Sequence, residues 1–209
     1  MLEFALALPV VLPIGLYGIE LANYSMVQLK LSQTAMALAD NASRVGVDTG
    51  LATQQIREVD VNDILQGARL QSGGIDLTTN GRVILSSLET TGTIPRQYLH
   101  WQRCVGLKSG STFDSSYGEE GDGANWWDFF QGMGESGEPV TAPVGSAVMF
   151  VEINYQYQPL ISKYFLGEPH LHVVSSFIVR DNRDLGAGLT NPNPSVPASK
   201  KSTCDRYST

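Results

Sequence analysis

The sequence predicts an α+β fold in which a long N-terminal helix lies on an antiparallel β-sheet. Three observations lead to it. Residues 1–46 are helix-like, with an apolar first half and a mixed second half. Residues 53–70 carry apolar side chains at helical spacing, which predicts a second, shorter helix. From residue 75 the apolar period changes to two, which is typical of strands, and helices followed by a meander belong to the α+β class.

The first element is apolar enough to be a membrane anchor. Residues 1–19 are apolar except for Glu3, and they include no Lys or Arg, unlike the basic start of a secretory signal peptide. A helix over residues 1–24 is long enough to cover the hydrocarbon core of a bilayer, which is roughly 30 Å thick. Pro9 and Pro13 argue against the alternative, a buried helix of a soluble protein, because membrane helices tolerate Pro better.

Glu3 has two interpretations. A carboxylate inside a bilayer costs several kcal/mol, on the order of 3, and therefore indicates a functional partner. Alternatively, its place near the start of the helix puts it among the lipid headgroups, where water solvates the charge.

Residues 25–47 are expected to continue the same helix outside the membrane. Small side chains recur there at steps of three and four residues, at Ser32, Ala35, Ala39, Ala42 and Gly46. Such a seam lets another helix approach closely, and the alternative is that it packs on the chain's own sheet. The segment Gly-Val-Asp-Thr-Gly at 46–50 is the expected end of the helix.

Residues 48–209 are expected to form one globular domain. Beyond the second helix, strands are predicted at 75–77, 82–89, 97–105, 148–156 and 172–179. Asn80-Gly81 predicts a type I′ hairpin between the first two. The strand 148–156 alternates cleanly, so its odd-numbered and even-numbered residues are expected to face opposite sides of the sheet.

A long irregular segment at 108–144 separates the third and fourth predicted strands, 97–105 and 148–156. Loops of this length are usually functional or disordered. Its aromatic residues are candidates for a partner-binding surface, because aromatic side chains dominate interface hot spots; they are Tyr117, Trp126, Trp127, Phe129 and Phe130. Two alternatives stay open. The aromatic residues anchor the loop on the sheet, or the acidic run at 119–123 binds calcium, although it lacks the spacing of an EF-hand.

The chain has two cysteines, Cys104 and Cys204. They lack the CxxC spacing and the nearby His of a zinc site. In a domain outside the cytoplasm they are expected to form a disulfide that holds the Pro-rich C-terminal tail to the sheet near Arg103. Two free thiols are the alternative.

Composition and motifs argue against several classes of function. The net charge is −7, whereas nucleic-acid binding requires clustered Lys and Arg. His100, His170 and His172 lack a recognisable third metal ligand, and the sequence shows no GxSxG, HExxH or phosphate-binding loop. Charged residues at 180–184 are expected to form a solvated cluster that closes the last strand. We expect no enzymatic activity, no metal and no cofactor.

Four segments carry a resemblance to a known family. Glu-Phe-Ala-Leu-Ala-Leu-Pro at 3–9 and Gly-Ile-Glu-Leu at 18–21 resemble the N-terminus of the TadE-like proteins, which are pseudopilins or minor pilins of tight-adherence (Flp-type) type IV pilus systems. Trp-Gln-Arg-Cys at 101–104 and Val-Arg-Asp-Asn-Arg-Asp-Leu at 179–185 are also similar to members of this group. The resemblance implies a pilin-like fold, with the helix in the bacterial inner membrane and the domain outside the cytoplasm.

The resemblance also implies roles and partners. It assigns assembly roles to Glu3, Phe4, Pro9 and Pro13. After extraction from lipid, Glu3 would pair with the N-terminal ammonium of a neighbouring pilin. The implied partners are other pilins and pseudopilins, the pilus assembly machinery and, before assembly, membrane lipid. Family members carry this Glu near the fifth mature position, behind a short leader that a prepilin peptidase removes. The peptidase is a further implied partner if such a leader lies upstream of Met1, which the sequence leaves open.

The apolar N-terminal segment predicts a single-pass membrane protein. The resemblance implies that this protein takes part in pilus assembly, and so in surface attachment and biofilm formation, and that it reaches the pilus or cell surface afterwards. Whether it enters the shaft, lies at the tip or primes assembly is open. Two alternatives remain. One is a static membrane-tethered periplasmic module that binds a ligand with the loop at 108–144. The other is a soluble periplasmic hydrolase.

Overall fold

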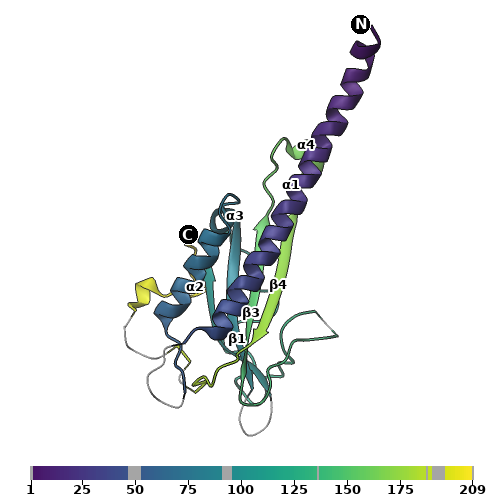
Figure 1. The fold of residues 1–209 in the computed structure, drawn as a ribbon. Helices are drawn as coiled ribbons and strands as arrows, with labels where there is room; N and C mark the ends of the chain where they lie inside the picture. The colour runs from purple at the N-terminus through teal and green to yellow at the C-terminus, as the bar shows by residue number, and fades with distance from the viewer. Residues whose placement is uncertain are drawn as a thin grey trace.

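The chain has the predicted α+β fold, in which a long N-terminal helix and shorter helices accompany a four-stranded antiparallel sheet (Figure 1). The structure is a computed structural model that describes residues 2–46, 53–90, 96–135, 137–186, 188–189 and 196–208, with side chains described from residue 6 and not at residue 199.

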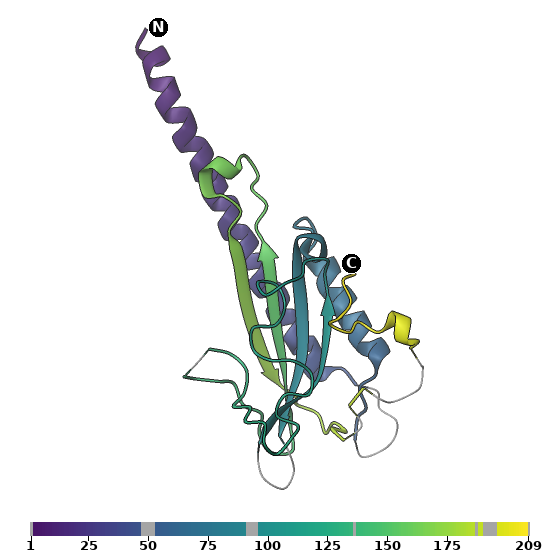
Figure 2. The same ribbon diagram turned by 180° about the vertical axis from the view of Figure 1, so that it is seen from behind.

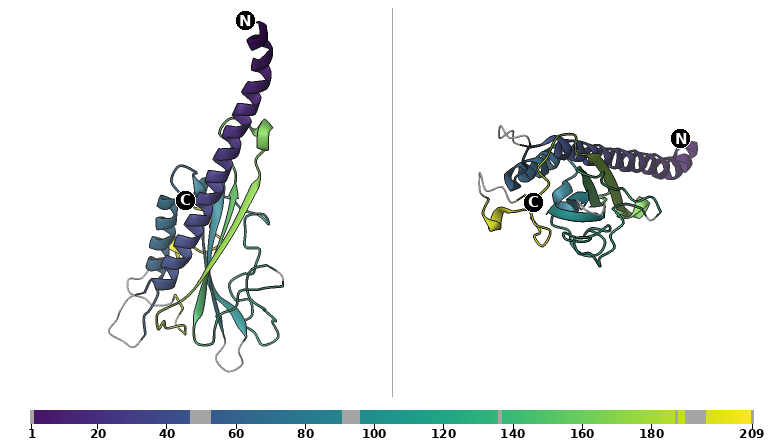
Figure 3. Two further views of the ribbon diagram at one scale, coloured as in Figure 1. Left: turned by 45° about the vertical axis from the view of Figure 1, so that its right-hand side comes forward. Right: turned by 90° about the horizontal axis from the view of Figure 1, so that it is seen from below.

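Helix α1 runs from Leu2 to Arg44 and continues through Pro9 and Pro13. Its N-terminal half projects beyond the domain, and its C-terminal half lies along the sheet (Figures 1 and 3). Every side chain from 6 to 19 is exposed. By length and composition, this helix is able to cross a membrane.

The C-terminal half of α1 is amphipathic. One face is buried at Val27, Leu31, Ala35, Leu38 and Ala42. Steps of three and four residues place these side chains on one stripe, which packs on the sheet and on α2.

Helix α2 covers Glu58–Gln71, so it starts later than the predicted residue 53. Asp60 explains the start, because its carboxylate accepts a hydrogen bond from the Arg57 backbone N–H at 2.9 Å. Residues 53–56 are not helical, and Gln54 pairs with Arg183 as an isolated parallel bridge.

The sheet has the strand order β2-β1-β3-β4, and all neighbouring strands are antiparallel. The strands are β1 (Gly81–Thr90), β2 (Gln97–Val105), β3 (Ala147–Gln156) and β4 (His170–Ile178). Two shorter helical elements complete the chain, α4 (Lys163–Leu166) between β3 and β4, and the 3-10 turn η1 (Ala198–Lys200) in the tail.

The hairpin predicted at Asn80-Gly81 is wrong. Residues before it form a helical turn, α3 (Leu77–Asn80), and Gly81 begins β1 with an extended φ of −153°. Gly81 is required here because of close packing between strands and not because of a tight turn. A Cβ at this position would lie 2.5 Å from the Asn154 carbonyl oxygen, so only glycine allows β3 to approach so closely.

The sheet separates two hydrophobic clusters, as the alternation in β3 predicted. Met149, Val151 and Ile153 face the helices and belong to the main core. Val148 and Phe150 face the other way and pack under the loop between β2 and β3, which crosses the sheet on the side opposite α1 (Figure 2). The central strands β1 and β3 are therefore buried on both faces.

Candidate assembly and partner surfaces

The residues assigned to assembly lie in the projecting part of α1. Glu3 and Phe4 are in its first turns, and their side chains lie outside the described part of the chain. Pro9 and Pro13 are exposed and do not interrupt the helix.

The small-residue seam packs against the chain's own domain. Ala35, Ala39 and Ala42 are fully buried in the main core, and Ser32 and Gly46 are half-buried. The helix ends at Arg44, two residues before the predicted stop at 46–50, of which residues 47–50 lie outside the described residues. Close approach at the seam therefore serves β3, β4 and α2 of the same chain.

An apolar stripe remains exposed on the opposite face of the same half of α1. Ala22 is exposed, and Met26, Leu29 and Met36 are 64%, 58% and 49% exposed. Their spacing of four, three and seven residues places them on one side of the helix, which also carries the exposed Gln33 between Leu29 and Met36. This side is continuous with the exposed segment that ends at Ile19. The sequence showed these apolar residues, but which face the domain covers became clear only from the structure.

A buried carboxylate marks the point where the bare part of α1 meets the domain. Glu20 is fully buried, and its carboxylate accepts hydrogen bonds from the Tyr157 hydroxyl at 2.5 Å and from two backbone N–H groups, Leu160 at 3.1 Å and Ile161 at 2.8 Å. These bonds fix the β3–β4 connection to the helix. The sequence gives one indication that Glu20 is special, because it is the only charged residue between Glu3 and Lys30.

The segment Trp-Gln-Arg-Cys ties β2 to three other parts of the fold. Trp101 is buried in the main core, and Gln102 donates to the Gly118 carbonyl of the loop at 3.1 Å. Arg103 joins helix and loop, because its guanidinium donates to Glu58 of α2 at 2.9 Å and to Glu120 at 2.7 Å. These residues are structural connectors.

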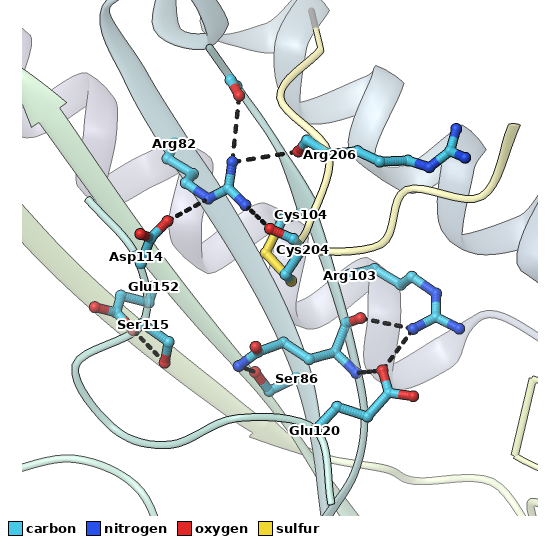
Figure 4. Close-up of a disulfide and its surroundings, with 12 residues drawn as sticks. Arg82, Ser86, Arg103, Cys104, Asp114, Ser115, Glu120, Glu152, Cys204 and Arg206 are labelled. Carbon is cyan, nitrogen blue, oxygen red and sulfur yellow. Dashed lines mark hydrogen bonds and ion pairs between the residues drawn. A yellow bond between two sulfur atoms is a disulfide. The ribbon is translucent and has the colours of Figure 1, made fainter. Parts of the chain in front are cut away.

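Cys104 and Cys204 form a disulfide, as predicted, which holds the C-terminal tail against β2 (Figure 4). The Cys104 backbone N–H also donates to the Ser202 carbonyl at 2.7 Å. Beneath the tail, the buried Arg82 guanidinium donates to the carbonyl of Cys204 and forms an ion pair with Asp114 at 3.3 Å. Burial lowers the pKa of Arg82.

Next to the disulfide lies an open cavity of about 390 Å³, whose lining includes Arg82, Gln102, Glu119 and Glu120. Among the described residues, no group of three or more His, Cys, Asp or Glu side chains is arranged to hold a metal ion. Glu120 is moreover engaged with Arg103.

The predicted solvated cluster at 180–184 is wrong for Arg183. This residue is only 8% exposed, and its guanidinium donates to the carbonyls of Ala42 at 3.0 Å and Val45 at 2.6 Å. The last carbonyls of a helix lack intrahelical donors, and Arg183 supplies them at the end of α1. Arg180, by contrast, is exposed as predicted.

The loop between β2 and β3 uses its aromatic residues in two ways. Tyr117 and Phe130 are half-buried and pack on the cluster that contains Phe150, so they anchor the loop. The remaining three are exposed: Trp126 by 77%, Trp127 by 71% and Phe129 by 87%. We call these three residues the aromatic patch.

The aromatic patch lies at the end of the sheet away from the N-terminus of α1. The Arg96 guanidinium, just before β2, donates to the Asn125 carbonyl at 2.8 Å, which places the patch beside the first residues of β2. A cavity of about 360 Å³ there is lined by Phe129, Phe130 and Thr141 among others.

The three histidines make structural contacts. His100 Nδ1 lies 2.9 Å from Glu89, and His172 Nδ1 lies 2.7 Å from the Asn154 side-chain oxygen. His170 and His172 stack with ring centroids 6.5 Å apart, and burial lowers the pKa of His170.

Comparisons of the chain with protein-family models, with curated proteins and with solved structures found no match. The features that bear on function are therefore those of the chain itself: the bare helix, its apolar stripe, the Glu20 junction and the aromatic patch.

Proposed function

We propose that this chain is a membrane-anchored pseudopilin or minor pilin that takes part in the assembly of a tight-adherence type IV pilus. The N-terminal part of α1 is held in the inner membrane, with the domain outside the cytoplasm. During assembly the helix leaves the lipid and packs among the helices of other pilins. The proposal includes no enzymatic activity, cofactor or nucleic-acid partner.

The observation that supports assembly, rather than anchoring alone, is the apolar stripe at Ala22, Met26, Leu29 and Met36. An anchor needs apolar surface only where it is in lipid. At about 1.5 Å per residue, Met36 lies roughly 24 Å along the helix from Glu20, well beyond the headgroup layer of a bilayer that ends near Glu20. Apolar side chains exposed at that distance favour a second protein surface.

Burial of the stripe against a neighbouring helix would contribute enough free energy to stabilise an assembly. Complete burial of a Leu or Met side chain contributes about 1.5 to 3 kcal/mol. Leu29 and Met26 each retain more than half of their exposure in the single chain, at 58% and 64%. Their burial between neighbouring helices would therefore add on the order of 1 to 2 kcal/mol each, repeated at every contact in a fibre.

Glu3 has a separate role in the proposal. A lone carboxylate in lipid is costly, and pairing it with the N-terminal ammonium of a neighbouring pilin removes the cost. Glu3→Ala should leave membrane insertion intact and abolish incorporation into pili. Normal piliation in cells that carry only Glu3→Ala would refute the pairing role.

The stripe provides the sharper test. Leu29→Glu places a charge in the stripe, and Gln28→Glu places the same charge on the neighbouring exposed residue at the side of it. In cells that assemble the pilus, both variants should stay in the membrane fraction with the disulfide intact. We expect the amount of protein in sheared pili to fall at least tenfold for Leu29→Glu only. Equal amounts for the two variants would contradict assembly through this face.

A second candidate is a static membrane-tethered module that binds a ligand with the aromatic patch. The exposure of Trp126, Trp127 and Phe129 favours it, because large aromatic side chains left in water are typical of binding sites. For this candidate, replacing all three by Ala should abolish ligand binding, whereas Leu29→Glu should bind the ligand normally.

A further inference from the structure

The connection between β3 and β4 brings a second apolar element to the level at which α1 leaves the domain. We call residues 157–167 the β3–β4 tip; it includes the short helix α4. The tip lies against α1 at the base of the bare rod in all three ribbon views (Figures 1–3). The Tyr17 and Phe165 rings contact each other there, with centroids 6.0 Å apart.

The position of the tip is fixed by buried bonds. The Glu20 carboxylate binds the backbone N–H groups of Leu160 and Ile161, and Tyr157 packs edge-on against Tyr24 with ring centroids 5.2 Å apart. Because these contacts come from α1 itself, the tip and the helix move as one unit at this point.

The outer surface of the tip exposes two large apolar or aromatic side chains beside the polar Gln158 and Lys163. Leu160 is 65% and Tyr164 is 93% exposed, although both lie next to residues that pack on α1. Between 157 and 167 the only charged residue is Lys163, which is also exposed. A Leu, a Tyr and a Lys on one small exposed element is the composition found at membrane–water interfaces, where Tyr lies at headgroup level and Lys extends its ammonium into water.

The height of the tip along α1 identifies the surface that it meets. From residue 6 through Ile19 the side chains of α1 are exposed and none is charged, and burial by the domain begins at Glu20. From Tyr17 to Glu20 the helix rises only about 4.5 Å, which is less than the thickness of a headgroup layer. A bilayer that covers the exposed part of α1 therefore reaches the tip.

We propose that the β3–β4 tip is a membrane-interface contact, in which Leu160 and Tyr164 enter the boundary between headgroups and acyl chains of the bilayer that holds α1. The inference rests on the anchoring of α1, which is part of the proposed function, and it is independent of pilus assembly. A second contact beside the helix prevents the domain from rotating or tilting freely about α1, so it fixes the direction of the apolar stripe relative to the membrane.

Photo-crosslinking to lipid tests this contact. p-Benzoylphenylalanine is introduced separately at Leu12, Tyr164 and Phe129 in the full chain, which is inserted into vesicles of phosphatidylethanolamine and phosphatidylglycerol. Position 12 reports on the anchor, position 164 on the tip, and position 129 is an equally exposed aromatic site at the far end of the domain. Because Tyr164 and Phe129 are both exposed, neither replacement removes a core contact.

We expect lipid adducts at positions 12 and 164 at least tenfold above those at 129. Adducts at 12 with background levels at 164 would overturn the tip contact and leave the anchor standing. Background levels at both 12 and 164 would overturn the anchor as well. Adducts from 164 to a second copy of the chain in place of lipid would also overturn the proposal, because the tip would then be a protein interface.

Discussion

The Tyr157 hydroxyl donates a 2.5 Å hydrogen bond to the Glu20 carboxylate, joining the end of the β3 segment to the N-terminal helix across 137 residues of sequence. Burial, together with the bond to Glu20, raises the pKa of Tyr157 to about 12. The hydroxyl therefore remains a donor at physiological pH. This pair and the two backbone donors at Leu160 and Ile161 form a hydrogen-bond cluster that joins α1 to the domain; we call it the clasp.

Glu20→Ala should open that clasp. The substitution leaves the N–H groups of Leu160 and Ile161 without their acceptor, and each unsatisfied donor costs about 1 to 3 kcal/mol. We expect amide hydrogen exchange in residues 157–167 to accelerate about 100-fold, which corresponds to about 3 kcal/mol. Exchange is measured on the full chain in detergent micelles. Glu168→Ala, at an exposed residue just after the tip, is the control and should leave exchange unchanged; equal effects would contradict the clasp.

Arg183→Met should destabilise the domain. It removes the donors to the Ala42 and Val45 carbonyls at the end of α1, which then lose their partners in a buried place. We expect the free energy of unfolding to fall by about 2 to 4 kcal/mol. The matched substitution Arg180→Met, at an exposed residue, should change it by less than about 0.5 kcal/mol. Urea denaturation followed by circular dichroism measures both, and similar values would show that the cap does not matter.

Loss of the disulfide should destabilise the domain mainly through the unfolded state. The bond closes a loop with a sequence separation of 100, for which chain entropy gives about 4 to 5 kcal/mol. Replacing Cys104 and Cys204 together by Ser avoids a free thiol. We expect the midpoint of urea denaturation to fall, and wild-type protein in reductant to fall by the same amount. A midpoint that reductant leaves unchanged would contradict a stabilising role.

His100 should make stability depend on pH. Its hydrogen bond with Glu89 raises the pKa of His100 in the folded state, in opposition to burial, and the charge of Glu120 adds to the effect. A raised pKa means that the folded state binds the proton more tightly. The stabilisation is complete below the unfolded pKa of about 6.5 and is lost as pH rises through the higher folded pKa.

The measurement for His100 compares wild type with His100→Gln by urea denaturation at several pH values from about 5.5 to 8.5. The difference in unfolding free energy should be largest at the acidic end and shrink as pH rises. A difference that stays constant over this range would show that the Glu89 pair does not act through protonation.

Local patterns predicted much of the fold, because they depend on neighbouring residues. The alternation in 148–156 placed Met149 and Phe150 on the correct faces, and the α+β class followed from the order of elements. Asn80-Gly81 misled because its turn propensity is local, whereas the actual need for glycine is set by β3, about seventy residues away. The structure places Asn154 directly against that position.

Contacts between residues far apart in the chain could not be predicted from local sequence patterns. In the sequence, Arg183 resembles the other surface charges near it. Its capping role depends on the end of α1 packing beside it, which brings the Val45 carbonyl within hydrogen-bond distance. Glu20 was visible as an isolated charge in an apolar segment, but its donors come from residues 157–161. The exposed stripe on α1 likewise depends on which side of the helix the sheet takes.

The C-terminal tail has a consequence for how copies of this chain meet. Backbone carbonyls of the tail and the loop already occupy the outer edge of β2 and its continuation. The N–H groups of Leu99, Cys104 and Gly106 donate to the carbonyls of Asp122, Ser202 and Ser208. A strand from another molecule would find these donors taken, so this border is closed to edge-to-edge polymerisation. If the chain assembles as proposed, its contacts with other copies must therefore use surfaces other than this border of the sheet.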